Sequence, residues 1–333
     1  VLTAGVGQNP ARQAGIKAGL PVEKPAYVVN QVCGSGLRSI AAGYQSIISN
    51  DAKIVVTGGQ ESMTNSPHTI NFRKDKKLEE EKLIDTMIKD GLWDAFNGYH
   101  MGVTAENVAE KYQITRNDQD NFAFNSQKKA IKAISENKFK EEIVPIKLKD
   151  QKIFDKDEYP RSDTNLEKLS NLKTVFKENG TVTAGNASGL NDGAAAVTLM
   201  NYRTSKDKGL KPIAKIVSWS QSGVDPKLMG TGPIPASKLA LKKAGWNIKD
   251  LDLVESNEAF AAQSIAVIKE LGLKEDIVNV NGGAIALGHP IGASGARILV
   301  TLVHEMQKRK YKKGLATLCI GGGMGISMCV ESI

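Results

Sequence analysis

Cysteine is scarce in this sequence, with only Cys33, Cys319 and Cys329 among 333 residues. Three widely spaced cysteines do not form a disulfide framework in a chain of this length, which favours a reducing compartment, and we expect a cytoplasmic location. Long hydrophobic runs are also missing, because no stretch approaches the roughly 18 to 20 apolar residues of a transmembrane helix. The first residues do not resemble a signal peptide either. We therefore expect no membrane association.

Aromatic residues make up only 5% of the chain, and 44 basic residues outnumber 36 acidic ones, for a formal net charge of +8. The lysines are scattered along apparent helices and are not interleaved with stacking aromatics, which disfavours a nucleic acid as partner. A solvated lysine surface is the simplest interpretation, and a small ligand carrying phosphates is the next. The 41% apolar and 24% charged residues are typical of a globular protein, and the length predicts two domains, or three.

Glycine is abundant, with 32 residues, and it clusters where strands are predicted to end. Residues 26–32 are predicted to form a buried strand that leads into Cys33-Gly34-Ser35-Gly36 and then into a helix with regularly spaced apolar residues. A second strand is predicted at 53–57, and its end is again rich in glycine. This alternation indicates a layered α/β fold.

From residue 64 to about residue 180 the sequence becomes charged and helical, with Thr115 and Asp118 as a capping pair for one helix. We interpret this region as an insertion over the α/β core. The α/β alternation then returns, with strands predicted at 193–200, 215–220, 251–254, 315–320 and 326–330, and helices after Pro235 and at 258–271.

A weak internal repeat accompanies this pattern. Cys33-Gly34-Ser35-Gly36 before one helix resembles Gly292-Ala293-Ser294-Gly295 before another, and Gly58-Gly59 after a strand resembles Gly322-Gly323. Either the chain contains two copies of one α/β unit, or glycine-rich turns resemble each other by chance.

Cys33 is predicted at the N-terminus of a helix, where unpaired N–H groups and the helix dipole favour a thiolate. It is either a nucleophile, approachable beside two glycines, or a buried structural cysteine. Cys319 ends an apolar strand before Gly321-Gly322-Gly323, and we expect a second exposed thiol there. Cys329 lies within a strand without nearby glycines and is interpreted as structural.

Among four histidines, His289 lies in a glycine-punctuated loop whose following Pro290 fixes the backbone, as a positioned base requires. His100, between Tyr99 and Met101-Gly102, is the second candidate, whereas His68 and His304 are interpreted as surface residues. No pair of histidines or thiols has the spacing of metal ligands, so we predict no metal site.

Two segments rich in asparagine also lie at predicted strand ends. Asn257-Glu258-Ala259-Phe260 follows the strand at 251–254, where α/β proteins often place their sites. Asn257 is either a site residue or only a helix cap. The segment from Asn186 to Gly193 is either part of a site or only a turn.

Four of these motifs, in their order along the chain, resemble the signatures of the thiolases. They are Gln31-Val32-Cys33-Gly34-Ser35-Gly36, Asn257-Glu258-Ala259-Phe260, Gly288-His289-Pro290-Ile291-Gly292 and Cys319-Ile320-Gly321-Gly322-Gly323. Tyr99-His100-Met101-Gly102 and Met229-Gly230-Thr231-Gly232-Pro233 are similar to the short-chain biosynthetic branch of that family, the acetyl-CoA acetyltransferases. The resemblance covers essentially the whole chain.

The resemblance implies a thiolase fold, an α/β fold of two similar layered halves (α-β-α-β-α) with a helical and loop insertion over the active site. Residues 1–63 are then the first half, 64–180 the CoA-binding insertion, 181–202 the return to the first half, and 203–333 the second half. Thiolases begin with a strand and a helix that are absent from this chain, so we expect the first sheet to lack strands and to expose apolar edges.

The resemblance also implies a chemistry. Cys33 accepts an acetyl group from acetyl-CoA after giving its proton to His289, and Cys319 deprotonates a second acetyl-CoA, which then attacks the acetyl-cysteine to give acetoacetyl-CoA and CoA. The imidazole of His289 and a water on Asn257 stabilise the enolate, and the backbone N–H groups of Cys33 and Gly321 serve the tetrahedral intermediate. No cofactor is implied, because the coenzyme A thioesters are substrates.

The remaining expectations concern binding and assembly. The resemblance implies an acyl pocket bounded by His100, Met101, Met229 and Phe260, with Ser188 near the pantetheine and Arg161 near the nucleotide of CoA. It implies a homodimer or homotetramer. The alternatives are a degradative 3-ketoacyl-CoA thiolase that acts on longer chains and a truncated, non-catalytic CoA-binding protein with the same fold.

Overall fold

Two β-sheets with two long helices between them organise the molecule. The computed structural model describes residues 1–71 and 82–333, so residues 72–81 of the predicted insertion lie outside the described part. The strands are β1 (Ile54–Ser62), β2 (His68–Thr69), β3 (Ile84–Asp85), β4 (Trp93–Asp94), β5 (Tyr99–His100), β6 (Ile146–Lys147), β7 (Ile153–Phe154), β8 (Asp192–Met200), β9 (Ala214–Gly223), β10 (Leu253–Ser256), β11 (Lys313–Ile320) and β12 (Met324–Ser332).

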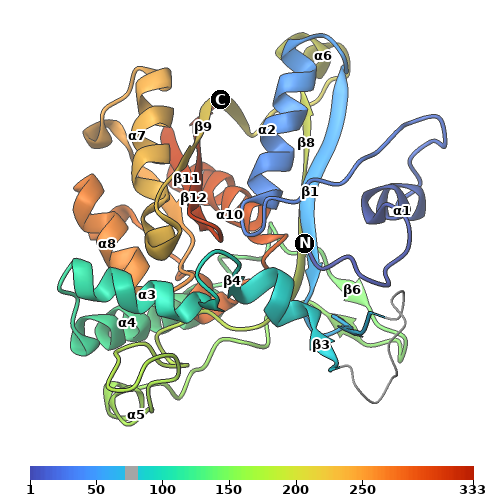
Figure 1. Cartoon of the computed structure of the whole chain (residues 1–333). Helices are drawn as coiled ribbons and strands as arrows, with labels where there is room; N and C mark the ends of the chain where they lie inside the picture. The colour runs from blue at the N-terminus through green and yellow to red at the C-terminus, as the bar shows by residue number, and fades with distance from the viewer. Residues whose placement is uncertain (72–81) are drawn as a thin grey trace.

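The α-helices are α1 (Pro10–Lys17), α2 (Ser35–Ile48), α3 (Met101–Lys111), α4 (Arg116–Ser135), α5 (Leu166–Ser170), α6 (Tyr202–Asp207), α7 (Pro233–Ala244), α8 (Ala261–Leu271), α9 (Ala284–Leu287) and α10 (Ser294–Arg309). Figure 1 shows α2 and α10 between the two sheets, with α7 on the outer side of the larger sheet. None of the helices in the described residues is both long and apolar enough to span a bilayer.

The larger sheet has the strand order β10-β11-β12-β9. Its only parallel pair is β10 with β11, and the other pairs are antiparallel. The strands of this sheet are almost entirely apolar where they contact α10, and Leu318, Ile320 and Ile326 are fully buried there. A sheet covered by helices on both faces reads as a continuous hydrophobic run, which explains why β11 was evident from the sequence.

The smaller sheet pairs β1 with β8 in antiparallel register, with Gly58 opposite Ala196. One face of this sheet packs against α2 and α10. Ile54 and Val56 of β1 keep 41% and 53% of their surfaces exposed. The described part of this sheet has two strands.

Helices α2 and α10 meet through two glycines that play equivalent parts. A Cβ on Gly36 of α2 would lie 2.6 Å from the backbone nitrogen of Ala296, and one on Gly295 of α10 would lie 2.4 Å from the backbone nitrogen of Leu37. Such contacts are shorter than side chains tolerate, so only glycine permits this close approach at either position. The helix-start part of the predicted internal repeat therefore corresponds to a reciprocal contact in the structure.

Helices α3, α4 and α5 of the predicted insertion gather at the lower left of Figure 1, where α3 and α4 pack against α8. Helix α4 begins with the predicted capping box, because the Asp118 carboxylate accepts from the Thr115 backbone N–H at 2.9 Å and the Thr115 hydroxyl accepts from the Asp118 N–H at 3.1 Å. Glu106 of α3 accepts from the backbone N–H groups of Thr181 and Val182 at 2.8 Å, which fastens the segment after residue 180 to this helix.

The strand predicted at 26–32 is wrong. Residues 26–30 have no regular structure, and Tyr27 and Val28 are 65% and 42% exposed. Instead of a strand ladder, the Ser35 hydroxyl accepts from the Gln31 N–H at 2.8 Å and donates to the Val32 carbonyl at 2.7 Å. Local side-chain bonds of this kind compete with sheet formation.

Other predicted elements are present with shifted ends. The strand predicted at 53–57 continues to Ser62, the helix predicted after Pro235 already begins at Pro233, and the helix predicted from residue 258 begins at Ala261. The last shift occurs because Phe260, in extended conformation, is the residue before that helix.

A buried carboxyl of β10 makes stability depend on pH. Glu255 is 1% exposed, and its nearest cation is Arg297, with Nη1 3.6 Å from Oε2. Burial raises the pKa of Glu255 to about 8, against the opposing charge of Arg297. Because this folded-state pKa exceeds the value of about 4.3 in an unfolded chain, the folded state binds the extra proton. We expect the free energy of unfolding to fall as the pH rises from about 5 to 8.

The substitution Glu255→Gln tests this expectation, because glutamine keeps the shape of the neutral acid and cannot ionise. We expect the variant to lose part of the pH dependence and to be more stable than the wild type at pH 8 by about 1 to 2 kcal/mol. Urea unfolding at a series of pH values measures both. Replacing the exposed Glu178 by glutamine is the control. Wild-type and Glu255→Gln curves of equal slope would contradict the prediction.

Candidate active site

Cys33 lies at a strained turn directly before α2. The preceding residue, Val32, has a φ of +46°, which is rarely adopted by a β-branched residue. Bonds from neighbouring side chains hold this conformation, since the Asn30 amide oxygen accepts from the Val32 N–H at 3.0 Å and the Ser35 hydroxyl bonds to the Val32 carbonyl. Strain at such a position costs on the order of 1 to 3 kcal/mol and is concentrated at functional sites.

The Cys33 sulfur accepts hydrogen bonds from the backbone N–H groups of Gly321 and of Cys33 itself. These bonds favour a thiolate, but burial outweighs them and raises the pKa of Cys33 to about 11, with a smaller contribution from the negative charge of Glu61. The expectation that the helix N-terminus makes Cys33 a thiolate is therefore wrong for this structure. The thiol needs a base when it reacts.

Cys319, near the end of β11, is fully buried, so the expected exposure of this second thiol is also wrong. Burial raises the pKa of Cys319 strongly, and the proximity of Cys33 is the second cause. The two cysteines, from opposite ends of the chain, therefore lie near each other, and we name the region around them the pocket. The backbone N–H of Gly321, two residues after Cys319, favours the thiolate of Cys33 and therefore lies near its sulfur.

Asn257 is brought to this pocket by the parallel pairing of β10 and β11. Ser256 lies opposite Thr317, and the Asn257 N–H donates to the Thr317 carbonyl at 3.0 Å. Because parallel strands end at the same edge of a sheet, the side chains that follow them meet there. The alternative interpretation of Asn257 as a helix cap is not supported, because α8 begins four residues later. Its amide oxygen is buried without a hydrogen-bond partner.

His289 faces Asn257, with Nε2 3.5 Å from the Asn257 Nδ2 atom. The backbone of His289 donates to the Asn191 side chain at 3.0 Å, and its Nδ1 lies 2.5 Å from the Ser294 hydroxyl. Burial, together with the smaller effect of the positive charge of Arg297, lowers the pKa of His289 to about 4. The imidazole is therefore neutral at physiological pH. Ile291 of the same loop packs in one cluster with Cys33, which brings the two segments together.

Buried carboxylates support these loops and were not recognised as such in the sequence. Glu258 accepts from Ser126 at 2.6 Å and from Asn279 at 2.8 Å, and it thereby ties the loop after β10 to the insertion. Glu61 accepts from the Gly292 N–H at 2.9 Å and holds the loop after His289. These contacts join residues far apart in the sequence, and no local motif predicts them.

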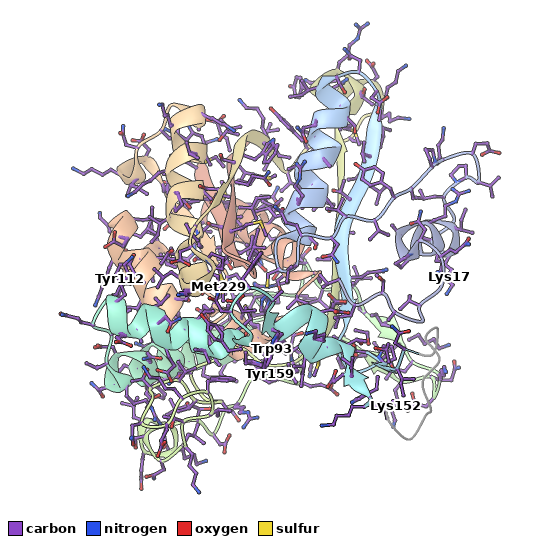
Figure 2. All side chains as sticks on the ribbon, in the orientation of Figure 1. Lys17, Trp93, Tyr112, Lys152, Tyr159 and Met229 are labelled. Atoms are coloured by element: carbon purple, nitrogen blue, oxygen red, sulfur yellow. The ribbon has the colours of Figure 1, made fainter. Side chains whose placement is uncertain are left out.

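The predicted acyl-pocket residues surround Cys319. Met101, Met229 and Phe260 share one buried apolar cluster with this cysteine. Met229, labelled in Figure 2, lies on the 3₁₀ turn Pro226–Thr231, which packs against α3 and α8. The pocket thus has an apolar wall built from three separate segments of the chain.

An aromatic stack extends this wall. The His100 ring stacks on Phe176, with ring centroids 4.6 Å apart, and Phe176 meets Phe260 edge to face at 6.4 Å. Burial lowers the pKa of His100, and its Nδ1 accepts from the Gly102 N–H at 3.0 Å at the start of α3. Phe176 was not singled out in the sequence, since a lone phenylalanine in a charged segment carries no local signal.

The predicted CoA contacts lie further from the sulfurs. The Ser188 N–H donates to the Ala259 carbonyl at 3.0 Å, so Ser188 lies beside the loop of Asn257. Arg161 is exposed, and its guanidinium carbon lies 6.0 Å from the ring centroid of Tyr159, which packs on Gly189. Tyr159 is labelled below Met229 in Figure 2. Tyr159 and Gly189 thus connect Arg161 indirectly to the neighbourhood of Ser188.

The other candidates lie apart from the pocket. His68 is exposed on β2, and His304 lies on α10. Cys329 is fully buried in an apolar cluster with Leu315, as expected of a structural cysteine. No group of three or more His, Cys, Asp or Glu side chains in the described part of the chain is arranged to hold a metal ion.

Comparison with known families defines the class of this fold and site. The chain matches "Thiolase, N-terminal domain" over residues 1–203 and "Thiolase, C-terminal domain" over residues 210–332. The chain therefore belongs to the thiolase family, and the resemblance inferred from the four motifs is confirmed.

Individual members of the family resemble this chain over nearly its whole length. The chain is 60% identical to the acetyl-CoA acetyltransferase of Paracoccus denitrificans, with 99% of this chain and 85% of that protein covered. It is also 60% identical to the enzyme of the same name from Rhizobium meliloti, with 100% and 86% covered. Among solved structures, the Bacillus anthracis acetyl-CoA acetyltransferase has a TM-score of 0.97 at 45% identity, covering 100% of this chain and 85% of that one.

A solved structure of another thiolase is similar as well. Human mitochondrial 3-ketoacyl-CoA thiolase has a TM-score of 0.94 at 45% identity, with 97% of this chain and 83% of that chain covered. The identity of this chain to both solved structures is thus the same.

Proposed function

We propose that this protein is an acetyl-CoA C-acetyltransferase, which condenses two acetyl-CoA molecules to acetoacetyl-CoA and CoA in a reversible reaction. The observations that carry the proposal are the proximity of Cys33 and Cys319, the packing of Ile291 in the His289 loop against Cys33, and the contact of His289 with Asn257. Two thiols in one pocket suit a reaction that needs one nucleophile and one base.

In the first half-reaction, Cys33 attacks the thioester carbonyl of acetyl-CoA while His289 takes its proton. The neutral state of His289 supports this role, because only a neutral imidazole accepts a proton. The bond from the carbonyl carbon to the CoA sulfur breaks, and the leaving CoA thiolate takes the proton of the Cys319 thiol. Acetyl-Cys33, free CoA, the imidazolium of His289 and the thiolate of Cys319 result.

In the second half-reaction, the Cys319 thiolate removes a proton from the methyl group of a second acetyl-CoA. The carbanion attacks the acetyl-Cys33 carbonyl, a carbon–carbon bond forms, and the bond to the Cys33 sulfur breaks. His289 then returns its proton to Cys33. The strongly raised pKa of Cys319 supports the choice of base, because a thiolate in an apolar site is a stronger base than one in water. Both thiols belong to the chain, so the reaction needs no cofactor.

Two sets of hydrogen-bond donors stabilise the negative charge that develops on the oxygen of the tetrahedral intermediate and of the enolate. The backbone N–H groups of Cys33 and Gly321, which bond to the resting sulfur, suit the tetrahedral intermediate at that cysteine. For the enolate, we propose the imidazolium of His289 and a water held by Asn257. The buried and unpartnered Asn257 amide oxygen supports the water, since such atoms are rarely left without a partner.

Replacing Asn257 by alanine tests this second set. Removing one such donor typically costs about 3 to 4 kcal/mol, so we expect condensation to slow 10²- to 10³-fold. Acetylation of Cys33 should change much less, because it uses the other donors. Steady-state condensation rates and single-turnover acetylation, measured on the same preparation, separate the two. Unchanged turnover would remove Asn257 from the site.

The apolar wall of Met101, Met229 and Phe260 supports a short acyl group as substrate. His100, stacked on Phe176 beside Phe260, extends this boundary, and we propose that Ser188 contacts the pantetheine and Arg161 the nucleotide of CoA. Lysines at the surface suit the CoA phosphates.

A degradative 3-ketoacyl-CoA thiolase is the second candidate, because the human enzyme of that name is as similar in sequence as the Bacillus anthracis structure. Thiolysis of acetoacetyl-CoA and of a 3-ketoacyl-CoA with a longer chain, compared by kcat/KM, tests the choice. We expect acetoacetyl-CoA to be preferred. A preference for the longer substrate would favour the second candidate, and thiolysis of neither would contradict both.

Assembly, location and domain organisation complete the proposal. We propose a homodimer or homotetramer from the family resemblance, and a cytoplasmic location from the scarcity of cysteine, all three of which are free thiols. The halves are proposed at 1–63 with 181–202 and at 203–333, with the CoA-binding insertion at 64–180 between the parts of the first half.

A further inference from the structure

A continuous row of polar groups leads from the pocket into the protein through His289. On the pocket side, Nε2 of His289 lies 3.5 Å from the Asn257 amide nitrogen. On the other side, Nδ1 lies 2.5 Å from the Ser294 hydroxyl, which is 3.0 Å from the Pro290 carbonyl oxygen. Ser294 is 1% exposed and begins α10, so water does not compete for these bonds.

The donor and acceptor roles in this row are fixed, because a hydroxyl has one hydrogen to donate and a carbonyl oxygen only accepts. The 3.0 Å contact between Ser294 and Pro290 is a hydrogen bond only if the serine donates to the carbonyl. The serine then has only lone pairs for the imidazole, and Nδ1 must donate to it. On the opposite side, the Asn257 amide nitrogen is a donor, so its 3.5 Å contact with Nε2 is a hydrogen bond only if Nε2 is unprotonated.

We propose that Ser294 is a positioning residue that fixes His289 in the tautomer with its hydrogen on Nδ1. The lone pair of Nε2 is thereby left on the side of Asn257 and the pocket. The consequence for catalysis rests on the proposed function, since this tautomer is the one that accepts a proton from Cys33. The tautomer itself is a property of the free protein and does not depend on that function.

The neutral state of the imidazole makes the tautomer important. Burial and the charge of Arg297 lower the pKa of His289 to about 4, so the resting ring carries one hydrogen. In the wrong tautomer, Nε2 would carry that hydrogen and could not act as a base. Once Nε2 is protonated, Nδ1 keeps its hydrogen, so the bond to Ser294 persists through the reaction without rearrangement. Partners that hold a histidine in this way are established in other enzymes.

Nitrogen NMR of the free protein labelled with ¹⁵N-histidine tests the proposal, because protonated and unprotonated ring nitrogens have well separated shifts. The chain has only four histidines, and the His289 signals are identified by their loss in His289→Asn. We expect a protonated Nδ1 and an unprotonated Nε2 in the wild type. A protonated Nε2 in the wild type would overturn the proposal.

The substitution Ser294→Ala removes the acceptor, and we expect the His289 signals to shift toward a mixture of tautomers. We also expect kcat to fall about 10- to 100-fold with little change in KM, the range for partners that orient a histidine. Ser294→Thr keeps the hydroxyl and should restore the wild-type shifts and most of the activity. Unchanged His289 shifts in folded Ser294→Ala would overturn the proposal even if activity fell.

Ser218→Ala is the matched control. The Ser218 hydroxyl is also buried and donates to a backbone carbonyl, that of Ala240 at 2.7 Å, but this bond joins β9 to α7. We expect Ser218→Ala to lower the free energy of unfolding by about 1 kcal/mol and to leave the His289 shifts unchanged. If the wild type lacked condensation activity, the proposed function would fail, while the NMR result would still decide the tautomer.

Discussion

Replacing Cys33 by alanine should lower the rate of acetoacetyl-CoA formation at least about 10⁴-fold, the scale on which nucleophiles are lost in covalent enzymes. The physical reason is that the backbone N–H groups of Cys33 and Gly321, which suit the tetrahedral intermediate, act on the Cys33 sulfur. Intact-protein mass spectrometry after brief mixing with acetyl-CoA provides the second readout. We expect the wild type to gain the mass of one acetyl group and the variant to gain none.

Cys329→Ala is the control for this experiment, because Cys329 is a free thiol in an apolar cluster away from the pocket. It should be acetylated as the wild type is, with a loss of stability only. Peptide mapping places the acetyl group on Cys33 in both proteins. An acetyl group on Cys319 or Cys329 in the wild type would assign the nucleophile to another thiol and contradict the proposed roles.

Replacing Cys319 by serine should separate the two half-reactions. Serine has nearly the same size, but its hydroxyl is far less acidic than a thiol and does not supply a base. Loss of a positioned base typically costs 10²- to 10⁴-fold, and we expect condensation to fall about 10³- to 10⁴-fold. Acetylation of Cys33 should persist, although more slowly, because the variant lacks the proton donor for the leaving CoA.

Exchange of label between acetyl-CoA and free CoA measures the first half-reaction alone, and exchange of the methyl protons of acetyl-CoA with solvent deuterium reports on the base. We expect Cys319→Ser to retain the first exchange and to lose the second. If methyl exchange continued at the wild-type rate, the base would be another group, and the assignment of Cys319 would fail.

The sequence predicted the fold class and the main parts of the site because their signals are local. The turn at Cys33, the loop at His289 and the strand ending at Cys319 each combine glycines with a neighbouring apolar run. Asn257 and Cys319 lie at neighbouring strand ends because β10 and β11 are parallel neighbours, with Ser256 opposite Thr317. Patterns of this kind survive in one sequence without knowledge of the tertiary structure.

The details that the sequence did not predict depend on tertiary contacts. Residues 26–32 have the composition of a strand, yet the Ser35 hydroxyl takes the backbone groups of Gln31 and Val32. A helix N-terminus favours a thiolate, yet burial of Cys33 has the larger effect on its pKa. Glu258 bonds to Ser126 and Asn279, and both of these residues lie far from Glu258 in the sequence. In each case a competing interaction from elsewhere in the fold decided the outcome.

The close contact of α2 and α10 has a consequence for how this site can evolve. Gly36 lies three residues after Cys33, and Gly295 lies next to Ser294, the partner of His289. The spacing between α2 and α10 therefore also determines the distance between Cys33 and His289. A methyl group added at Gly36 or Gly295 shifts the helix spacing and the distance between Cys33 and His289 together. Selection for a dense core and selection for a fast reaction therefore favour the same glycines.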